Sequence, residues 1–379
     1  MCIRDSATSV DQRKTDFSIN EGHNFQGLGR GGGLNVMFRG AATHNKVTLY
    51  RCHFISNSAI WGGGLKVTFG DQVSMNSFVA YESVFETNWC TSHAGGGADV
   101  GYSYFSQPFP RGNEIKFSNC NFTGNVAKFG GGLAFYSSRG SHENLDNSIE
   151  FVSCRWSHNK ARFGSAIDTN THAWTTFLSG YLPSPKFTDT IFLENSVIPK
   201  IHDQITFSFY KKGNGAFLST EFTIHFFGTV NFTNNNGSAL YLVSSTAVFE
   251  QNTTVTFHNN TGFNGGAIAL IGFSFLILSD DVLIVLSGNT AVRCGGAIYS
   301  YSIDKHDYVS SRSCFIQNVK MFGNDHWTNT SVTFINNSAG MIGSDKFMYC
   351  GHSIYAITLL PCYHACKMDT ADDLSLIHI

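Results

Sequence analysis

Acidic side chains are the first candidates for chemistry in this chain, because polysaccharide cleavage needs paired carboxylates, or calcium with a basic residue. Asp99 and Asp168 come closest to a shared pattern, since each follows a small or aliphatic residue just after a glycine-rich run. Neither has an evident acidic partner, and Glu114, Asp189 and Asp203 stand at other positions relative to such runs. We therefore expect solvated loop carboxylates and no catalytic residues.

Metal, cofactor and nucleic-acid signatures are also missing from the sequence. The 15 histidines show no His-x-x-x-His spacing, and neither Gly-x-Ser-x-Gly nor a P-loop occurs. The formal net charge is −2 with 14% charged residues, and the sequence contains no basic run. We therefore expect no cofactor, no metal and no nucleic-acid partner.

One group of cysteines shares a position in a repeat. Cys52, Cys120 and Cys154 each stand two residues before an aromatic residue, and Ser83 fills that place in the intervening copy. Cys120 and Cys154 would then be stacked neighbours. Their separation allows a disulfide, whereas their parallel side-chain directions favour a ladder of reduced core cysteines.

A second group of cysteines, Cys350, Cys362 and Cys366, clusters near the C-terminal end. The spacing of Cys362 and Cys366 with His364 between them could suggest zinc, but the paired-ligand pattern of a zinc site is absent. We prefer a disulfide-stapled cap or linker over residues 350–372.

Asparagine-linked glycosylation is a further candidate modification, and each Asn-x-Ser/Thr sequon is a legal acceptor in a secreted protein. The loop sequons at Asn252 and Asn329 are the best candidates. At Asn259 and Asn336 we expect crowding, because each directly precedes an asparagine of the repeat. The seven sequons are Asn121, Asn231, Asn236, Asn252, Asn259, Asn329 and Asn336.

A repeat must position all of these residues. An aromatic or aliphatic residue is followed three residues later by asparagine, and then by a run of glycines that ends on a small or aliphatic residue. The first glycines, for example Gly31, Gly62 and Gly95, recur roughly every 30–35 residues, which indicates one structural unit stacked on itself. The copies are Phe54 with Asn57, Phe85 with Asn88, Phe122 with Asn125, Trp156 with Asn159, Phe257 with Asn260, Leu286 with Asn289, and Phe334 with Asn337.

The local pattern of each copy is that of strands. Val47-Thr48-Leu49 and Ile115-Lys116-Phe117 alternate apolar and polar side chains, the period of a half-buried strand. Helices are disfavoured, because the chain has 38 glycines and each glycine inside a helix costs roughly 1 kcal/mol. Residues 276–278 and 282–286 flank a polar turn at 279–281 and predict two buried strands, because a membrane helix would need about 20 apolar residues.

These observations predict an all-β fold, a single-stranded right-handed parallel β-helix (a solenoid) of about ten coils over residues 7–349. The aromatic residues would form an inward ladder, and the asparagines a second ladder at a turn, where Asn tolerates a left-handed backbone. The glycines would stand where the chain bends. Between residues 174 and 228 the repeat is lost, which predicts a coil with long insertions or a lateral loop.

The Phe-x-x-Asn and Gly-Gly-Ala-Ile pair resembles the repeats of chlamydial polymorphic outer-membrane proteins and of secreted right-handed β-helix proteins from sponges and cnidarians. The resemblance covers roughly residues 15–366 and is best in 295–299, 332–339 and 353–362. Gly164-Ser165 and Gly237-Ser238 depart from it. It implies an extracellular, surface-displayed or adhesive module rather than an enzyme.

The two ends of the chain are related through their codons. One back-translation of Met1-Cys2-Ile3-Arg4-Asp5, reversed and complemented, encodes the closing residues 374–379 after a shift of frame. Residues 1–6 and 373–379 are therefore predicted to derive from one sequencing adapter and are excluded from fold reasoning. Membrane anchoring would then be possible only through termini that are missing here.

The sequence favours an extracellular or cell-surface structural and adhesion module, a rigid solenoid that displays loops for an unidentified protein or glycan ligand. One alternative is a carbohydrate-active β-helix enzyme, a polysaccharide lyase or glycoside hydrolase, in which Asp99 and Asp168 would lie two coils or about 10 Å apart. A weaker alternative is a bacterial autotransporter passenger, against which the sequons and the odd number of cysteines count, nine when Cys2 of the predicted adapter segment is set aside.

Overall fold

The computed structural model describes most of the repeat region as strands and the turns between them. The chain divides into two compact units, residues 1–207 and 208–379, each treated separately below. All regular elements among the described residues are strands, as the sequence predicts. None of these residues belongs to a helix with the length and apolar character to cross a membrane. The described residues are 2–4, 9–13, 16–18, 30–40, 42–70, 72–102, 110–137, 146–171, 184–198, 215–272, 274–301, 319–321, 330–340 and 346–349.

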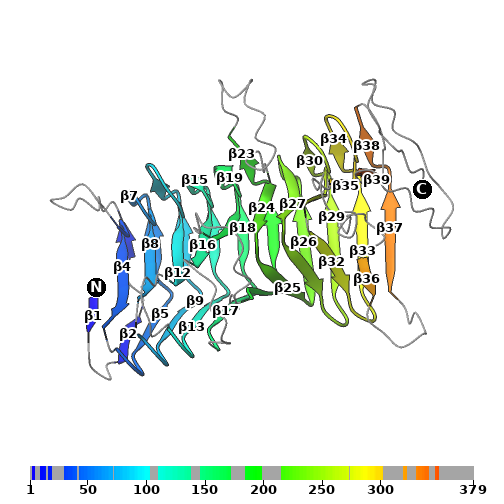
Figure 1. The fold of residues 1–379 in the computed structure, drawn as a ribbon. Coiled ribbons are helices and arrows are strands. Elements are labelled where there is room, and N and C mark those ends of the chain that lie inside the picture. Colours follow the sequence, from blue (N-terminus) through cyan, green and yellow to red (C-terminus); the bar gives the residue numbers. More distant parts are fainter. Residues whose placement is uncertain are drawn as a thin grey trace. The chain divides into compact units, whose positions relative to one another are not determined.

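Unit 1 is a parallel β-helix in which each coil adds one strand to each of four sheets, named A to D here (Figure 1). Sheet A contains β4 (Leu34–Arg39), β8 (Leu65–Phe69), β12 (Ala98–Tyr102), β16 (Leu133–Ser137) and β20 (Ile167–Thr171). Sheet B contains β5 (Lys46–Tyr50), β9 (Ser77–Tyr81), β13 (Glu114–Ser118), β17 (Ser148–Val152) and β21 (Lys186–Thr188). Sheet C contains β6 (His53–Ile55), β10 (Val84–Glu86), β14 (Asn121–Thr123), β18 (Arg155–Ser157) and β22 (Ile191–Leu193). Sheet D contains β7 (Ser58–Ala59), β11 (Trp89–Cys90), β15 (Val126–Phe129), β19 (Lys160–Phe163) and β23 (Ser196–Val197).

Three short strands precede the first complete coil of unit 1. They pair in parallel with β4, β5 and β6 and so continue sheets A, B and C by one coil. The pairing of residues 2–4 describes their backbone and does not test where this segment comes from. Its origin in a sequencing adapter stays a prediction. The strands are β1 (Cys2–Arg4), β2 (Ser9–Arg13) and β3 (Asp16–Ser18).

Unit 2 repeats the same coil, with ladder asparagines separated by 25, 29 and 48 residues. Its equivalent of sheet A contains β24 (Gly215–Thr220), β27 (Ser238–Val243), β31 (Ile268–Ile271), β35 (Ile298–Tyr301) and β39 (Lys346–Tyr349). The equivalent of sheet B contains β25 (Thr223–Phe227), β28 (Thr246–Phe249), β32 (Phe275–Leu278) and β36 (Val319–Met321). The equivalent of sheet C contains β26 (Thr229–Thr233), β29 (Thr254–His258), β33 (Leu283–Ser287) and β37 (Ser331–Ile335). The equivalent of sheet D contains β30 (Thr261–Gly262), β34 (Thr290–Ala291) and β38 (Ser338–Ala339).

The prediction that the repeat is lost between residues 174 and 228 was wrong for the described part of that segment. β21, β22 and β23 lie within it and pair in register with the preceding coil. Phe192 with Asn195, and Phe232 with Asn235 just beyond the segment, are two further copies of the motif. Sequence reasoning missed the first because no glycine run follows it.

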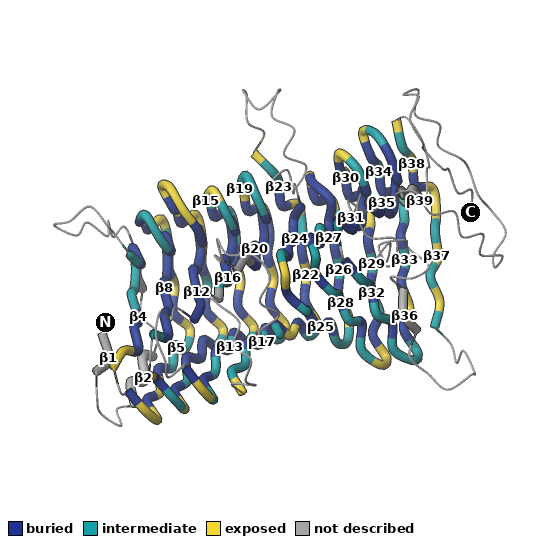
Figure 2. Tube along the Cα trace, viewed as in Figure 1, coloured by how far each residue is buried: buried dark blue, intermediate teal, exposed yellow. Residues whose placement is uncertain are grey.

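The aromatic residues of the repeat form a continuous inward column in unit 1, whereas in unit 2 Leu286 takes one place in the column. The ring centroids of Phe54 and Phe85 lie 4.8 Å apart with an interplanar angle of 3°. Those of Phe85 and Phe122 lie 4.6 Å apart, and the Phe122 and Trp156 rings are 5.4 Å apart. All four side chains are fully buried, although their neighbours on β6, β10 and β14 are half-buried or exposed. Figure 2 shows β8 and β12 of sheet A, which close the same core, as buried. The column therefore supplies the core of the coil.

The asparagine ladder satisfies every hydrogen-bonding atom of its side chains. The Oδ1 atom of Asn125 accepts from the backbone N–H of Asn88 at 2.9 Å and from its Nδ2 at 3.0 Å. The Nδ2 atom of Asn125 donates to the carbonyl of Phe85 at 2.8 Å and to Oδ1 of Asn159 at 3.0 Å. The amide is thus saturated, as a buried amide must be. The ladder comprises Asn57, Asn88, Asn125, Asn159 and Asn195 in unit 1, and Asn235, Asn260, Asn289 and Asn337 in unit 2.

A second asparagine ladder, which sequence reasoning missed, lies before the strands of sheet B. Asn45 donates to Oδ1 of Asn76, Asn76 to that of Asn113, and Asn113 to that of Asn147, each through its backbone N–H and its side-chain amide. A sequence signal exists, because each asparagine stands two residues before the first apolar residue of its strand. The four coils of unit 1 that carry Asn45, Asn76, Asn113 and Asn147 are therefore held along two turns.

Two steric constraints explain the glycine runs, a left-handed backbone at the first glycine and close contact between coils at the second. The first glycine adopts a left-handed backbone, with φ of 62° at Gly62 and 72° at Gly95, where other residues are strained. The second glycine approaches the next coil closely: a Cβ added at Gly96 would lie 2.7 Å from the carbonyl oxygen of Val126. At Gly96 a side chain would therefore collide with the backbone of the next coil.

Substituting Asn125 with alanine should lower the free energy of unfolding by about 3 kcal/mol or more, because several buried groups lose partners that are each worth roughly 1–3 kcal/mol. Chemical denaturation of the protein from a bacterial host, which adds no glycans, measures the change. Asn121→Ala is the matched control, because Asn121 lies in the same coil and is exposed. Equal destabilisation by the two substitutions would contradict a ladder that supports the fold.

Candidate functional site

The sequons lie mainly on the outer turns of the coils. Asn121, Asn236 and Asn252 are exposed, whereas Asn231 is half-buried. Asn259 and Asn336 are also exposed, so the expected crowding by their ladder neighbours is absent. Both have a left-handed backbone, with φ of 52° and 51°, which turns the side chain outward while the next asparagine enters the ladder. Asn329 lies outside the described residues, and the occupancy of all seven sites stays a prediction.

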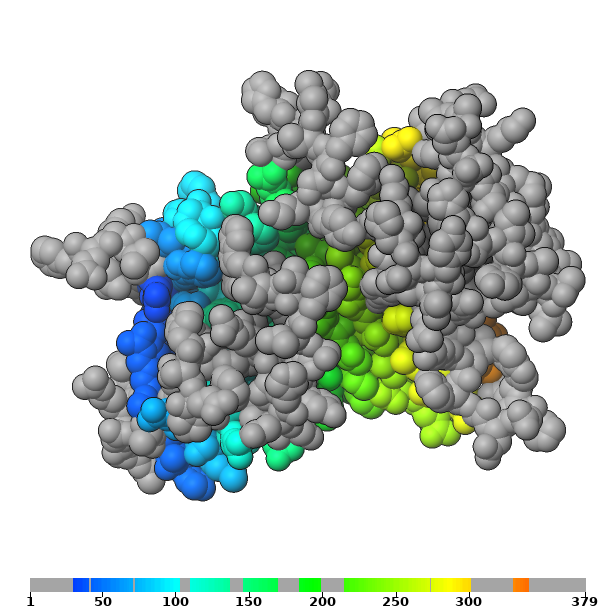
Figure 3. All heavy atoms as spheres, viewed as in Figure 1, coloured from blue at the N-terminus to red at the C-terminus, as the bar shows by residue number. Residues whose placement is uncertain are grey.

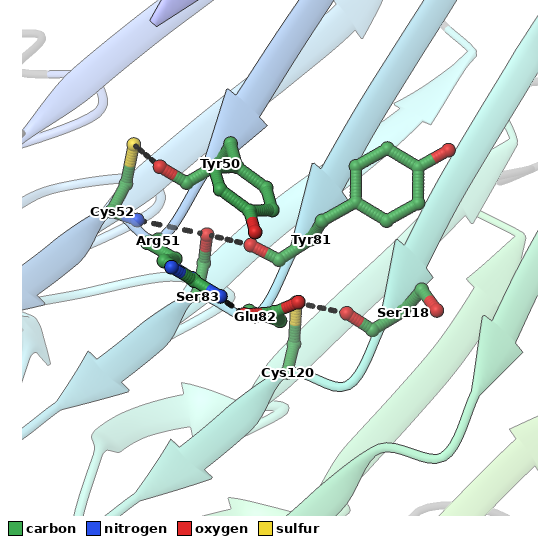
Figure 4. Close-up of polar contacts among 8 residues, drawn as sticks. All are labelled: Tyr50, Arg51, Cys52, Tyr81, Glu82, Ser83, Ser118 and Cys120. Atoms are coloured by element: carbon green, nitrogen blue, oxygen red, sulfur yellow. Dashed lines mark hydrogen bonds and ion pairs between the residues drawn. The ribbon is translucent and has the colours of Figure 1, made fainter. Parts of the chain in front are cut away.

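Cys52, Cys120 and Cys154 lie at the turns between the strands of sheets B and C and form a column along unit 1. Ser83 occupies the same place in the intervening coil, as the sequence indicates. Figure 4 shows the backbone N–H of Cys52 directed at Oγ of Ser83, 3.1 Å away, and the Sγ atom of Cys52 near the carbonyl of Tyr50. Cys120 and Cys154 follow in the next coils and are free, buried thiols. Of the two alternatives, the structure therefore has the reduced ladder. Cys350, Cys362 and Cys366 lie outside the described residues.

The thiols of Cys90 and Cys154 are buried in the core and are not placed for nucleophilic attack. Burial is the main cause that raises the pKa of Cys154 well above its usual value, followed by its contact with Cys120. Burial likewise raises the pKa of Cys90 to about 11. Because the thiolate is the reactive species, these cysteines are inert at neutral pH.

The acidic residues are arranged differently from the expectation of solvated loop carboxylates, which was wrong for Asp99 and Asp168. Both stand on strands of sheet A, where the register runs Asp99, Ala134, Asp168 across three neighbouring strands. Their exposed fractions are 0% and 2%. Glu114 belongs to sheet B, whereas Asp189 lies exposed on a turn, so neither joins them. Asp203 lies outside the described residues.

Asp99 belongs to a buried polar cluster on sheet A that sequence reasoning did not find. Lys66, its neighbour in register on β8, contacts its carboxylate, and the two form a buried ion pair. The Nζ atom of Lys66 also lies 3.4 Å from Oη of Tyr136, which is 3.3 Å from Oγ1 of Thr68. The rings of Trp61 and Tyr136 flank the ammonium group at 5.2 and 4.8 Å. The cluster therefore surrounds one buried cation.

Electrostatics keep this pair ionised. Burial is the largest single influence and lowers the pKa of Lys66, but the attraction by Asp99 and Tyr136 and the hydrogen bonds to both together outweigh it, so that the pKa lies above its usual value. A buried pair with such partners is costly to break, because removing one member leaves an uncompensated charge. The sequence contained a signal for this ion pair, because Lys66 and Asp99 each stand two residues after the glycine run of successive copies.

Asp168 lacks such compensation. Its Oδ1 atom is buried and has no hydrogen-bond partner among the described residues. Burial raises the pKa of its carboxyl group to about 8, so the group is mainly neutral at pH 7. Sheet A thus carries one ionised and one neutral carboxyl group, two strand spacings or about 9.6 Å apart by backbone register.

This arrangement resembles, in protonation states alone, the general acid and base of a glycosidase. Both carboxyl groups, however, are almost completely buried, and a substrate would have to displace whatever covers them. The described residues contain no group of three or more His, Cys, Asp or Glu side chains placed to hold a metal ion. The site therefore has the chemistry of a buried charge network.

Replacing Asp168 with asparagine should remove a pH-dependent loss of stability. The folded-state pKa of about 8 lies above the ordinary 3.8, so the wild-type carboxyl group favours folding below pH ~4 and loses that contribution as pH rises toward ~8. Within this window the wild-type free energy of unfolding should fall by up to roughly 1.4 kcal/mol per pH unit relative to Asp168→Asn.

Denaturation of both proteins across this pH range measures the difference. Asp189→Asn serves as the control, because Asp189 is an exposed carboxylate on the same coil. Parallel pH curves for the wild type and Asp168→Asn would show that the group is charged and solvated.

Comparison of the chain with protein-family models, with curated protein sequences and with solved structures found no match. The assignment to the parallel β-helix class consequently depends on the chain's own strand pairing. That pairing is regular, with register between equivalent residues of successive coils in sheets A, B and C. The fold is therefore assigned by geometry, and function must be argued from the outer faces of the coils.

Proposed function

We propose that the protein is an extracellular or cell-surface module, a rigid β-solenoid that presents its outer turns to a protein or glycan ligand. The exposure of five described sequons carries the proposal: Asn121 lies on β14 of unit 1, and Asn236, Asn252, Asn259 and Asn336 lie between strands of unit 2. Such sites are used only in a secreted protein. The resemblance to chlamydial surface repeats and to secreted sponge and cnidarian β-helix proteins points to the same role.

The rigidity of the frame supports this role. Both ladders consume the polar groups of the turns, and the aromatic column fills the interior, so that the coils have little freedom to move past one another. Large apolar side chains nevertheless remain on the outside: Trp89 is 57% exposed and Phe263 is 54% exposed. Aromatic residues of this kind are frequent anchors in binding interfaces.

The proposal predicts glycan attachment and adhesion in a secreting eukaryotic host. Thr254→Ala removes the sequon of exposed Asn252 and should lower the mass of the secreted protein by one glycan, as measured by mass spectrometry. Beads coated with the wild-type protein should adhere to animal cells or extracellular matrix. Protease or periodate treatment of that target then distinguishes a protein ligand from a glycan.

Thr254→Ser is the matched variant, because it keeps the sequon and should keep the mass. Beads coated with heat-unfolded protein control for non-specific adhesion. Failure of the folded protein to adhere to any cell or matrix target, together with unmodified sequons, would reject the module.

A carbohydrate-active enzyme is the second candidate, and one observation favours it. Asp99 and Asp168 stand on the same face of sheet A with unlike protonation states, which is the pairing that acid–base cleavage of a glycosidic bond uses. In that function Asp168 would be the proton donor and Asp99 the base.

The enzyme candidate predicts release of reducing ends or unsaturated sugars from neutral or acidic polysaccharides. Asp168→Asn should then lower the rate at least about 100-fold, the usual share of a general acid, while the exposed-site variant Asp189→Asn keeps it. An inactive wild-type protein across both classes of polysaccharide, or an Asp168→Asn variant that is fully active, would argue against the enzyme.

A further inference from the structure

The outer face of sheet D in unit 1 gathers basic side chains that lie far apart in the sequence. Lys160 on β19 stands opposite Val126 on β15, and Val126 stands opposite Trp89 on β11. Lys128 and Arg162 occupy the next outward position on the same two strands, because the residues that flank them are paired in register. We call Trp89, Lys128, Lys160 and Arg162 the basic strip.

The cations of the basic strip are held by aromatic rings. The Nζ atom of Lys128 lies 5.1 Å from the ring centroid of Phe129, and Cζ of Arg162 lies 5.1 Å from that of Phe163. The two rings are themselves stacked at 5.1 Å with an interplanar angle of 14°. Parallel rings therefore hold two positive groups side by side, about one strand spacing of 4.8 Å apart.

Negative charge is absent from the strands that carry the strip. β7, β11, β15, β19 and β23 contain Lys128, Lys160 and Arg162 but no Asp or Glu. Lys128 and Lys160 are exposed and form no ion pair with any residue that the structure describes. In Figure 3 atoms of this stretch of unit 1, coloured cyan to blue-green, reach the molecular surface. The positive potential of Lys128 and Lys160 is therefore open to an anionic ligand.

One feature favours an acidic glycan over nucleic acid. Trp89, 57% exposed beside the cations, adds a flat apolar surface with a polar N–H, which suits a sugar ring.

We propose that the basic strip is the binding site for an acidic, sulfated or carboxylated glycan chain, an inference that rests on the proposed adhesive function and names its ligand class. The chain would run across the strands of sheet D, with its anionic groups on Lys128, Lys160 and Arg162. A sugar ring would lie against Trp89 at one end of the strip.

Binding of the whole 379-residue chain to immobilised heparin, a sulfated polysaccharide, tests the proposal. The double variant Lys128→Gln/Lys160→Gln should bind roughly tenfold or more weakly, since a Lys near an anionic surface contributes about 1 kcal/mol. Its matched control, Lys46→Gln/Lys186→Gln, loses the same charge from exposed positions of sheet B. Trp89→Ala should weaken binding while the salt dependence of the affinity stays as in the wild type, because no charge is removed.

The possible outcomes distinguish a failure of the basic strip as a glycan-binding site from a failure of the proposed adhesive function. Equal losses in both double variants would show a response to net charge and overturn the strip. Double-stranded DNA that competes as well as soluble heparin would overturn the assignment to a glycan. A wild-type protein that adheres to cells but ignores heparin would overturn the ligand class and leave the adhesive module in place. Thermal unfolding of each variant excludes loss of fold as the cause.

Discussion

The fold depends on one interaction, the stacked asparagine amide. A buried amide has two donors and an acceptor that must all find partners, and leaving one unpaired costs about 1–3 kcal/mol. At Asn125 the partners come from the coil before and the coil after, through Asn88, Phe85 and Asn159. An asparagine at the same place in the next coil supplies both the acceptor for this amide and the donors that continue the pattern. The amide ladder therefore enforces register along each unit.

Register in turn explains why the turns can vary while the core does not. Successive copies of the motif are separated by 31, 37, 34 and 36 residues in unit 1, yet the aromatic rings stack at spacings of 4.6–5.4 Å. Extra residues are accommodated in loops between the strands, where added length costs little free energy. The outer faces can consequently change in sequence without disturbing the interior.

The same register creates sites from residues that are distant in the chain. Lys66 meets Asp99, and Tyr136 joins them from a third coil. On sheet D, Lys128 and Arg162 become neighbours by the same rule. Sites of this kind have no local motif, because their members are one repeat apart and are separated by structural residues. In a stacked coil, clusters of side chains are therefore formed by residues on neighbouring strands and not by residues close in sequence.

The sequence by itself determined the fold class, the aromatic and asparagine ladders, and the place of Ser83 in the cysteine column, because these features recur at one phase of a periodic pattern. It did not reveal the copy at Phe192 and Asn195, which no glycine run follows. Only the tertiary structure decided that Asp168 is buried and uncharged, that Asn259 and Asn336 face outward, and that separate cations form the basic strip. Whether a side chain is buried, and which side chains lie beside it, depends on the neighbouring coils. The pattern within one copy of the repeat does not contain this information.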